Sequence, residues 1–384
     1  MMNKPKIRFS GYTEAWEQRK LSHVVNVYDG VHQTPEYKDE GVMFLSVENI
    51  TTLKSKKYIS EEAFERDYKV YPEKGDILMT RIGDIGTPNV VESSEKLAFY
   101  VSLALLKPHG IDSYYLKNAI QSKSFQKGLR ERSLLTAIPM KINKDEIGKV
   151  DVFIPKDIEE QKKIGAAFKK LDHLITLHQR KCDQTKKLKK YMLQKMFPQN
   201  GELYPEIRFE GFTNAWEQRK LGDEAIEMLA GGDIDKSRVV ENGKYPIYAN
   251  ALTNDGIVGY YDDYYRVKAP AVTVTGRGDV GHAQARTVDF TPVVRLLAIR
   301  SEHDAYFLEN AINNHGVIVE STGVPQLTVP QLGNYMIQFP RTIEEETKIG
   351  TYFQSLDHLI TLHQRKRDEL MKIKKYMLQN MFAM

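Results

Sequence analysis

The sequence has few of the residues that build disulfide frameworks, thiolate zinc sites and membrane spans. Its 384 residues include a single cysteine, Cys182, so a disulfide framework and a zinc site of four thiolates are excluded. No apolar run reaches the length of a membrane span, and the stretch MMNKPKIRFSGY lacks one of signal-peptide length. We therefore expect a soluble, cytoplasmic protein.

Motifs that would carry catalysis are also missing. There is no G-x-x-x-x-G-K-[ST] phosphate loop and no Asn-Pro-Pro-aromatic stretch of the kind that amino-methyltransferases use. Acidic residues are scattered rather than clustered as in a nuclease metal site. Cys182 falls within a helical heptad pattern, which is a poor place for a nucleophile. We expect no catalytic residue, no bound cofactor and no metal in this chain.

The charge balance excludes little. Lysine and arginine number 55 against 51 acidic residues, for a formal net charge of +4. A mildly basic chain is compatible with a nucleic-acid partner but does not require one.

What the sequence does have is an internal repeat. The stretch LDHLITLHQRK occurs at Leu171–Lys181 and again at Leu356–Lys366, inside a repeated segment of forty residues. A second pair, here called the frame segments, lies at Pro5–Leu21 and Pro205–Leu221. Weaker matches lie between these segments, such as ILMTRIGDIG at Ile77–Gly86 with VTVTGRGDVG at Val272–Gly281. The whole chain is therefore a tandem duplication whose two intervening domains have diverged.

The forty-residue repeats predict two long helices. Apolar residues follow a 4-3-4-3 heptad spacing, and no proline or glycine interrupts the pattern after the first turns. Forty helical residues span about 60 Å, and such a helix cannot bury its apolar stripe alone. We expect the two copies to pack antiparallel and to bring Phe382 near Pro5. The alternative is that each helix packs on its own domain. The heptad positions are Ile164, Phe168, Leu171, Ile175 and His178, and their repeats Ile349, Phe353, Leu356, Ile360 and His363.

The second half of each repeated helix is rich in lysine. The residues are Lys186, Lys187, Lys189, Lys190 and Lys195, and in the second copy Lys372, Lys374 and Lys375. A solvated face and an attraction to phosphates or an acidic partner both explain such a run, and the sequence does not decide between them.

The intervening domains contain mostly short β-runs, rich in aromatic and β-branched residues, with one or two helices such as Tyr114–Leu129. In the second domain, Gly276–Gly281 fits G-x-G-x-x-G, the pattern of a dinucleotide or S-adenosylmethionine loop. No helix pattern and no suitably placed acidic residue follow it, and the first copy lacks the first glycine. We interpret both loops as tight turns between strands that carry a basic residue.

These turns are the candidate functional site. An arginine precedes G-D-[IV]-G in both copies. If the two domains read different DNA sequences, we expect Arg81 and Arg277 to contact phosphates, because such domains do not share base contacts. The alternative is that the glycines serve only the turn and the arginines form salt bridges. The residues expected near DNA are Thr80, Arg81, Gly83, Asp84, Gly86 and Lys141, and in the second copy Thr275, Arg277, Gly278, Asp279, Gly281 and Gln326.

The chain resembles the specificity subunits of type I restriction–modification systems. The resemblance rests on the R-F-x-G-[YF]-x-x-A-W-E-Q-R-K-L block at Arg8–Leu21 and Arg208–Leu221, on the run at Gly75–Leu78, and on the I-P-x-x-I-E-E-Q block at Ile154–Gln161. The second copy departs slightly, with FPRTIEEE at Phe339–Glu346.

The resemblance implies a non-catalytic subunit that binds double-stranded DNA with a bipartite target. It implies an α+β fold of two β-rich target-recognition domains in pseudo-two-fold tandem repeat, separated by two long antiparallel coiled-coil helices. The helices would space the half-targets and dock two modification (methyltransferase) subunits that methylate adenine, and two restriction subunits would join. S-adenosylmethionine, ATP and Mg²⁺ would be bound by those partners, and no membrane is involved.

The expected domains are 1–21 (frame), 22–155 (first intervening domain), 156–197 (helix), 198–221 (linker and frame), 222–340 (second intervening domain) and 341–384 (helix). Two other functions stay open: a coiled-coil adaptor whose domains bind proteins, and an enzyme that uses the G-x-G-x-x-G loop.

Overall fold

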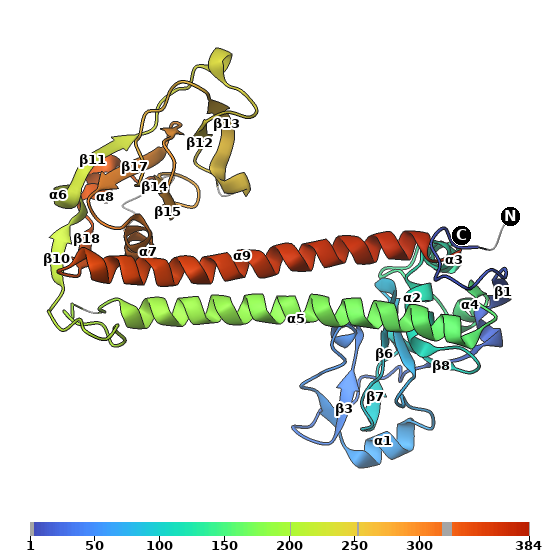
Figure 1. Cartoon of the computed structure of the whole chain (residues 1–384). Helices are drawn as coiled ribbons and strands as arrows, with labels where there is room; N and C mark the ends of the chain where they lie inside the picture. The colour runs from blue at the N-terminus through green and yellow to red at the C-terminus, as the bar shows by residue number, and fades with distance from the viewer. Residues whose placement is uncertain (1–3, 200, 252, 317–324, 384) are drawn as a thin grey trace. The chain divides into compact units, whose positions relative to one another are not determined.

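The computed structural model of the chain describes residues 4–199, 201–251, 253–316 and 325–383. It consists of two compact units (Figure 1). The first unit contains Met1–His178 with Arg365–Met384, and the second contains Gln179–Gln364. Each unit therefore holds one frame segment, one intervening domain and parts of both long helices.

The first unit is built on two sheets. One is antiparallel with the strand order β2-β8-β5-β6, and the other has the order β4-β3-β7, with β3 and β7 parallel. A separate strand pair joins β1 to β9. The elements are β1 Glu17–Lys20, η1 Leu21–His23, β2 Val25–Asp29, β3 Val42–Leu45, η2 Val47–Asn49, β4 Tyr58–Ile59, α1 Glu61–Asp67, β5 Ile77–Ile82, β6 Asp84–Val90, β7 Leu97–Phe99, β8 Leu103–Pro108, α2 Ser113–Ile120, α3 Lys123–Arg132, α4 Lys144–Gly148 and β9 Asp151–Ile154.

The second unit repeats this plan. Its sheets have the orders β11-β17-β14-β15 and β13-β12-β16, with β12 and β16 parallel, and β10 pairs with β18. The elements are β10 Glu217–Lys220, α6 Leu221–Glu224, β11 Ala225–Ala230, η3 Lys236–Arg238, β12 Tyr245–Tyr248, η4 Thr253–Gly256, β13 Ile257–Tyr261, β14 Ala271–Thr275, β15 Ala283–Arg286, β16 Thr291–Pro292, β17 Leu296–Ser301, α7 Ala305–His315, α8 Val329–Gly333 and β18 Met336–Phe339. The two intervening domains thus share one topology despite their divergent sequences.

The two long helices are α5, Ile158–Met196, and α9, Ile343–Asn380. In the first unit the rings of Phe168 and Phe382 lie 5.7 Å apart, and Asp172 pairs with Lys374 at 2.7 Å. Because the residue number rises along α5 as it falls along α9, the segments run antiparallel, as expected.

The second unit contains the same contacts with the roles of the helices exchanged. The Phe197 and Phe353 rings lie 6.0 Å apart, and Lys189 pairs with Asp357 at 2.7 Å. Asp357 is the repeat of Asp172 and Lys189 that of Lys374, so the same ion pair occurs once in each unit.

Each frame segment closes onto the end of a long helix. The amide of Ile7 donates to the carbonyl of Asn380 at 2.9 Å, and that of Ile207 donates to Lys195 at 2.8 Å. The expected approach of the C-terminal residues to the first frame segment is confirmed by the first of these bonds and by the contact of Trp16 with Phe382.

A buried ion pair fixes each frame segment to a helix start. Arg8 donates to both carboxylate oxygens of Glu160, at 2.6 and 2.8 Å, and Arg208 does the same with Glu345, at 2.7 and 2.8 Å. Both carboxylates are buried. This bidentate geometry explains why the frame arginine and the glutamate of the I-E-E motif occur together in both copies.

The heptad prediction is only partly right. Ile164 and Phe168 lie in the core of the first unit, and their repeats Ile349 and Phe353 lie in the core of the second, as does Leu356. These positions face their own domain as well as the end of the other helix, so the alternative interpretation holds there. The other positions are half-buried: Leu171, Ile175, His178, Ile360 and His363.

A glycine near the start of each long helix allows this packing. A Cβ on Gly165 would lie 2.6 Å from a carboxylate oxygen of Asp112, which caps α2, and Gly350 faces Asp304, the cap of α7, in the same way. The expected helix at Tyr114–Leu129 is two helices, because Ser122 interrupts it and caps α3.

Candidate functional site

In the first intervening domain the site is the β5–β6 hairpin. Gly83 occupies its tip with a φ of 80°, a value that favours glycine. Lys141 is exposed and forms a β-bridge with Ile82 beside the tip, while Thr80 accepts a hydrogen bond from the amide of Thr87 at 2.9 Å. The predicted strand-to-strand turn is confirmed.

Not every glycine of this turn faces solvent. Gly86 has a φ of 90°, and a Cβ there would lie 2.6 Å from a methyl carbon of Leu129 on α3. The side chain of Gln126 also donates to the Gly86 carbonyl at 2.8 Å. Gly86 therefore seats the hairpin on α3, and Asp84 lies at the tip, where Thr80 donates to it at 3.3 Å.

Arg81 is buried rather than available to a phosphate. Only 5% of its surface is exposed; its guanidinium forms an ion pair with Asp29 and donates to the carbonyl of Ile142 at 3.1 Å. Burial lowers the pKa of Arg81, although a guanidinium still carries its charge at neutral pH. This geometry favours the salt-bridge alternative for Arg81.

In the second intervening domain the turn after β14 has the same hydrogen-bond plan. Thr275 accepts from the amide of His282 at 2.9 Å, as Thr80 does from Thr87. The amide of Gly276 donates to the carbonyl of Arg295 at 2.9 Å, and the Gly276 carbonyl accepts from Leu327 at 2.8 Å. Gln326, the neighbour of Leu327, forms a β-bridge with Arg277.

These bonds agree with the match of ILMTRIGDIG to VTVTGRGDVG and separate the two arginines by one position. The Arg81 amide donates to Ser102 at 3.0 Å and its carbonyl accepts from Ile142 at 3.0 Å, so Gly276 and not Arg277 is its structural counterpart. Arg277 instead corresponds to Ile82. The premise that both arginines share one position is therefore wrong.

The replacement of Arg81 by Gly276 is matched by a second change. Gly30 and Gly231 make the same close backbone approach, to Tyr100 and to Val293, so the preceding residues, Asp29 and Ala230, correspond. The first domain places an ion pair where the second has alanine and glycine.

The glycines of the G-x-G-x-x-G pattern each have a structural task. A Cβ on Gly276 would lie 2.5 Å from the Arg295 carbonyl oxygen and 3.0 Å from that of Leu327. Gly278 and Gly281 have φ values of 78° and 84°. The pattern is thus accounted for by the turn, which has neither the following helix nor the geometry of a phosphate loop.

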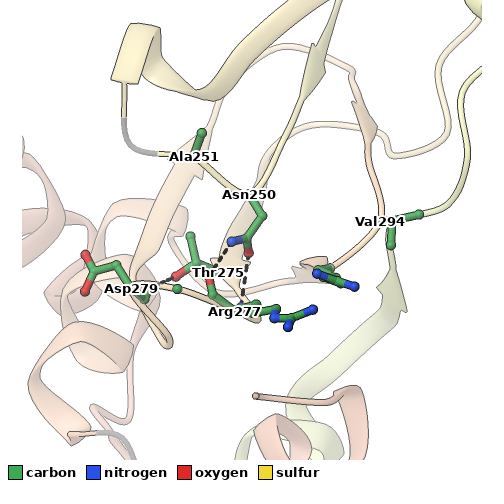
Figure 2. Close-up of a pocket in the computed structure, with 8 residues that line it drawn as sticks. Asn250, Ala251, Thr275, Arg277, Asp279 and Val294 are labelled. Atoms are coloured by element: carbon green, nitrogen blue, oxygen red, sulfur yellow. Dashed lines mark hydrogen bonds between the residues drawn. The ribbon is translucent and has the colours of Figure 1, made fainter. Parts of the chain in front are cut away.

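A pocket of about 440 Å³ lies against this turn (Figure 2). The side chain of Asn250 binds the backbone of the turn. Its oxygen accepts from the amides of Gly276 and Arg277, at 2.8 and 3.4 Å, and its nitrogen donates to the Arg277 carbonyl. The lining residues are Asn250, Ala251, Thr275, Arg277, Gly278, Asp279, Val294 and Arg295.

Two arginines, Arg277 and Arg295, supply positive charge to this pocket. Arg277 is half-buried and Arg295 is exposed, and neither guanidinium has a protein hydrogen bond or ion pair within the described residues. Arg295 also has a φ of 75°, a left-handed conformation that costs on the order of 1 kcal/mol or more for a residue other than glycine. The pocket therefore presents two guanidinium groups, with no protein partner in the described residues, to an acceptor-rich ligand.

Asn250 and Arg295 were not expected from the sequence. Arg295 lies in VVRLLAIR, where nothing marks it, and Asn250 follows the β-run KYPIY in a turn-rich stretch. An asparagine two residues after a β-run is a weak turn signal, and it is the only one that points to either residue.

A second cluster of ionisable groups lies at the base of the second unit. His303 contacts Glu346 at 2.8 Å and Glu224 at 3.0 Å, and its ring stacks on Phe339. Burial opposes the charged ring, but the two carboxylates outweigh it and raise the pKa of His303. In the first unit Gln161 occupies the position of Glu346 and accepts from the Asp112 amide at 3.0 Å.

The described residues hold neither a candidate metal cluster nor a candidate membrane span. No group of three or more His, Cys, Asp or Glu residues in the described ranges is arranged to hold a metal ion. No helix of the described structure is long and apolar enough to span a membrane.

Most of the chain is similar to one known protein family. The family model of the type I restriction modification DNA specificity domain matches twice, at residues 13–187 and 214–372. The chain belongs to this family. Specificity subunits are the non-catalytic, DNA-recognising part of type I systems, and the two intervening domains are accordingly its target-recognition domains.

The relatives agree with this assignment. A Methanocaldococcus jannaschii protein named as the MjaX specificity subunit of a type I restriction enzyme is 22% identical over 412 residues, covering 97% of this chain and 94% of that protein. A Mycoplasma pneumoniae protein named as the type I specificity subunit S.MpnORF507P is 25% identical over 224 residues, 57% of this chain. That match spans 58% of the Mycoplasma protein.

The fold has a counterpart among solved structures. The crystal structure of the type I restriction–modification S subunit from M. genitalium superposes with a TM-score of 0.75 at 14% identity, covering 99% of both chains. The expected α+β fold of two tandem domains with two long helices is confirmed.

Proposed function

We propose that each intervening domain binds one half of a bipartite, asymmetric target in double-stranded DNA. The supporting observation is that the two domains share one topology and one turn geometry and follow frame segments of near-identical sequence. Their side chains nevertheless differ at that turn. Two readers of one fold with different side chains suit a target whose halves differ in sequence.

The long helices set the spacing of the half-targets in this proposal. Inserting four residues in α5, between Thr185 and Lys186, and four in α9, between Leu370 and Met371, would lengthen both helices by about 6 Å. This corresponds to about two base pairs at ~3.4 Å each. The unread spacer should grow by one or two base pairs while both half-sequences stay unchanged. A changed half-sequence with an unchanged spacer would contradict the proposal.

The helices also dock two modification (methyltransferase) subunits, to which restriction subunits then add. Five of the ten heptad residues lie in the cores of the two units and the other five are half-buried, so the heptad positions offer little exposed surface for docking. Each unit instead exposes an apolar pair on a helix: Leu188 and Tyr191, 44% and 50% exposed, and their repeats Ile373 and Tyr376, 47% and 58% exposed. A patch that occurs twice fits two copies of one partner. S-adenosylmethionine, ATP and Mg²⁺ are bound by these partners and not by this chain.

Native mass spectrometry tests the docking surface. Tyr191→Ala and Tyr376→Ala should each leave one modification subunit bound, and the double variant should bind none. Tyr204, which is 54% exposed in the linker, supplies the matched control Tyr204→Ala. Full stoichiometry in the double variant would place docking elsewhere.

The decisive experiment is sequencing the methylated adenines in a host that carries this chain with its modification subunits. The expected result is one motif of two short, different halves separated by unread bases. A coiled-coil adaptor would instead show no sequence preference when gel shifts compare the specific duplex with random DNA. Methyl transfer by the purified chain alone would contradict its non-catalytic role.

A further inference from the structure

Three positions around the turn differ in chemistry between the two domains although the backbone is the same. The amide of Tyr100 donates to Leu45 and that of Val293 donates to Tyr248, both at 2.8 Å, which aligns the ends of β3 and β12. Two residues further along are Val47 in the first domain and Asn250 in the second.

The other two positions follow from the hairpin bonds described above. Ile82 corresponds to Arg277, and Ser102 corresponds to Arg295. In the first domain the Ser102 hydroxyl accepts from the Val47 amide at 3.2 Å, so these positions also adjoin one another there. The first domain thus has valine, isoleucine and serine where the second has asparagine and two arginines.

This difference reverses the expected role of Arg277. A shared arginine would have argued for a phosphate contact, because phosphates are common to every sequence. An arginine that only one domain carries, at a position where the other has isoleucine, is suited to a feature that only one half-target has.

The environment of Arg277 suits base reading. Asn250 fixes the backbone on both sides of it, so the guanidinium starts from a defined position (Figure 2). Arg295 lines the same pocket from a left-handed backbone, where a residue other than glycine is kept against a conformational cost. Arginine pairs in a bidentate manner with O6 and N7 of guanine, which is the commonest specific contact in the major groove.

We propose that Arg277 reads a guanine in the half-target of the second domain, with Arg295 as a second donor at the same pocket and Asn250 as the residue that positions the turn. The first domain, with Ile82 and Val47 there, makes apolar contact instead and does not require guanine at the matching place. This inference rests on the proposed function and assigns a specific base to one of the DNA contacts.

The test uses the complex of this chain with its modification subunits. Arg277→Ile installs the residue of the first domain, and Arg277→Lys keeps the charge but removes the bidentate fork. Both should turn one guanine of the second half-motif into an unspecified base in the methylome and leave the first half-motif unchanged. Binding to the original duplex should fall about 5- to 150-fold, which is the discrimination of one bidentate pair.

A modified base makes the assignment specific. Replacing guanines one at a time by 7-deazaguanine, which lacks N7, should weaken binding of the unaltered complex at one position. The Arg277→Ile complex should be indifferent to the same replacement. Arg295→Ser should weaken binding of the same duplexes.

Two results would overturn the proposal. If Arg277→Ile keeps the original guanine in its methylome, Arg277 does not read it. If the variant loses affinity equally for all sequences and its salt dependence becomes shallower, Arg277 contacts a phosphate. In both cases the unaltered complex still yields a bipartite motif, whereas a missing motif in the unaltered complex would refute the proposed function itself.

Discussion

Replacing Arg81 by alanine removes the cation from a buried ion pair in the first intervening domain. The Arg81 side chain is 6% exposed and that of Asp29 is 24% exposed. Removing one partner of such a pair leaves an uncompensated charge and costs about 3–5 kcal/mol. For a unit of about 200 residues, each kcal/mol lowers the melting temperature by about 2–4 °C. The first unit should therefore melt roughly 6–20 °C lower.

The duplication supplies a matched control. The double variant Asp29→Ala with Arg81→Gly copies the second domain, where Ala230 and Gly276 occupy these positions. Since it leaves no unpaired charge, it should recover most of the lost stability. Trp16 and Trp216 lie in the cores of the first and second units, so tryptophan fluorescence in a Trp216→Phe background reports the first unit alone.

A specific pair of results would refute this reasoning. An unchanged melting temperature for Arg81→Ala, combined with weaker binding to all DNA sequences, would restore Arg81 as a phosphate contact. If the double variant is less stable than the single variant, the alanine and glycine of the second domain cannot replace the ion pair of the first.

Three further changes test the long helices and the second unit. Asp172→Asn should cost about 1–3 kcal/mol, because Asp172 bonds two lysines, whereas Asp357→Asn, at a carboxylate 42% exposed, should cost at most ~1 kcal/mol by urea denaturation. The raised pKa of His303 contributes stability that is complete below its unfolded pKa of about 6.5 and is lost as the pH rises through the folded value. The second unit should thus weaken above neutral pH, and Glu346→Gln should flatten that profile. Gly350→Ala, which normally stabilises a helix, should destabilise α9 by about 1–3 kcal/mol, measured by calorimetry, because the methyl group meets the cap of α7.

The sequence predicted those features that depend on residues close together in the chain or on the repeat itself. Heptad spacing located both long helices to within four residues at each end, and the offset between copies predicted the antiparallel packing and the closure at Asn380. These predictions succeed because a helix period and a duplicated block are visible without knowing the fold.

The candidate site was predicted less well, for a physical reason. The turn glycines were identified correctly, but Arg81 and Arg277 were treated as one shared position, although the match of ILMTRIGDIG with VTVTGRGDVG pairs Arg81 with Gly276, as the backbone hydrogen bonds do. Asn250 follows β12 and Arg295 precedes β17, and both reach the turn only through the sheet topology. No local pattern reports such contacts, so pairing between distant segments had to be seen.

Divergence between the copies has occurred in coupled sets rather than at single residues. Where the first domain has Asp29 and Arg81, the second has lost both charges. In the first unit Gln161 accepts a hydrogen bond from the Asp112 amide. The second unit has Glu346 at this position, and His303, in the place of Ile111, pairs with it. A buried charge persists only with its partner, because either one alone carries the full cost of desolvation. Arg277, which is half-buried, and Arg295, which is exposed, have no such partner within the described residues. Under the proposed base reading they can therefore vary with the DNA sequence, while the buried pairs change only together.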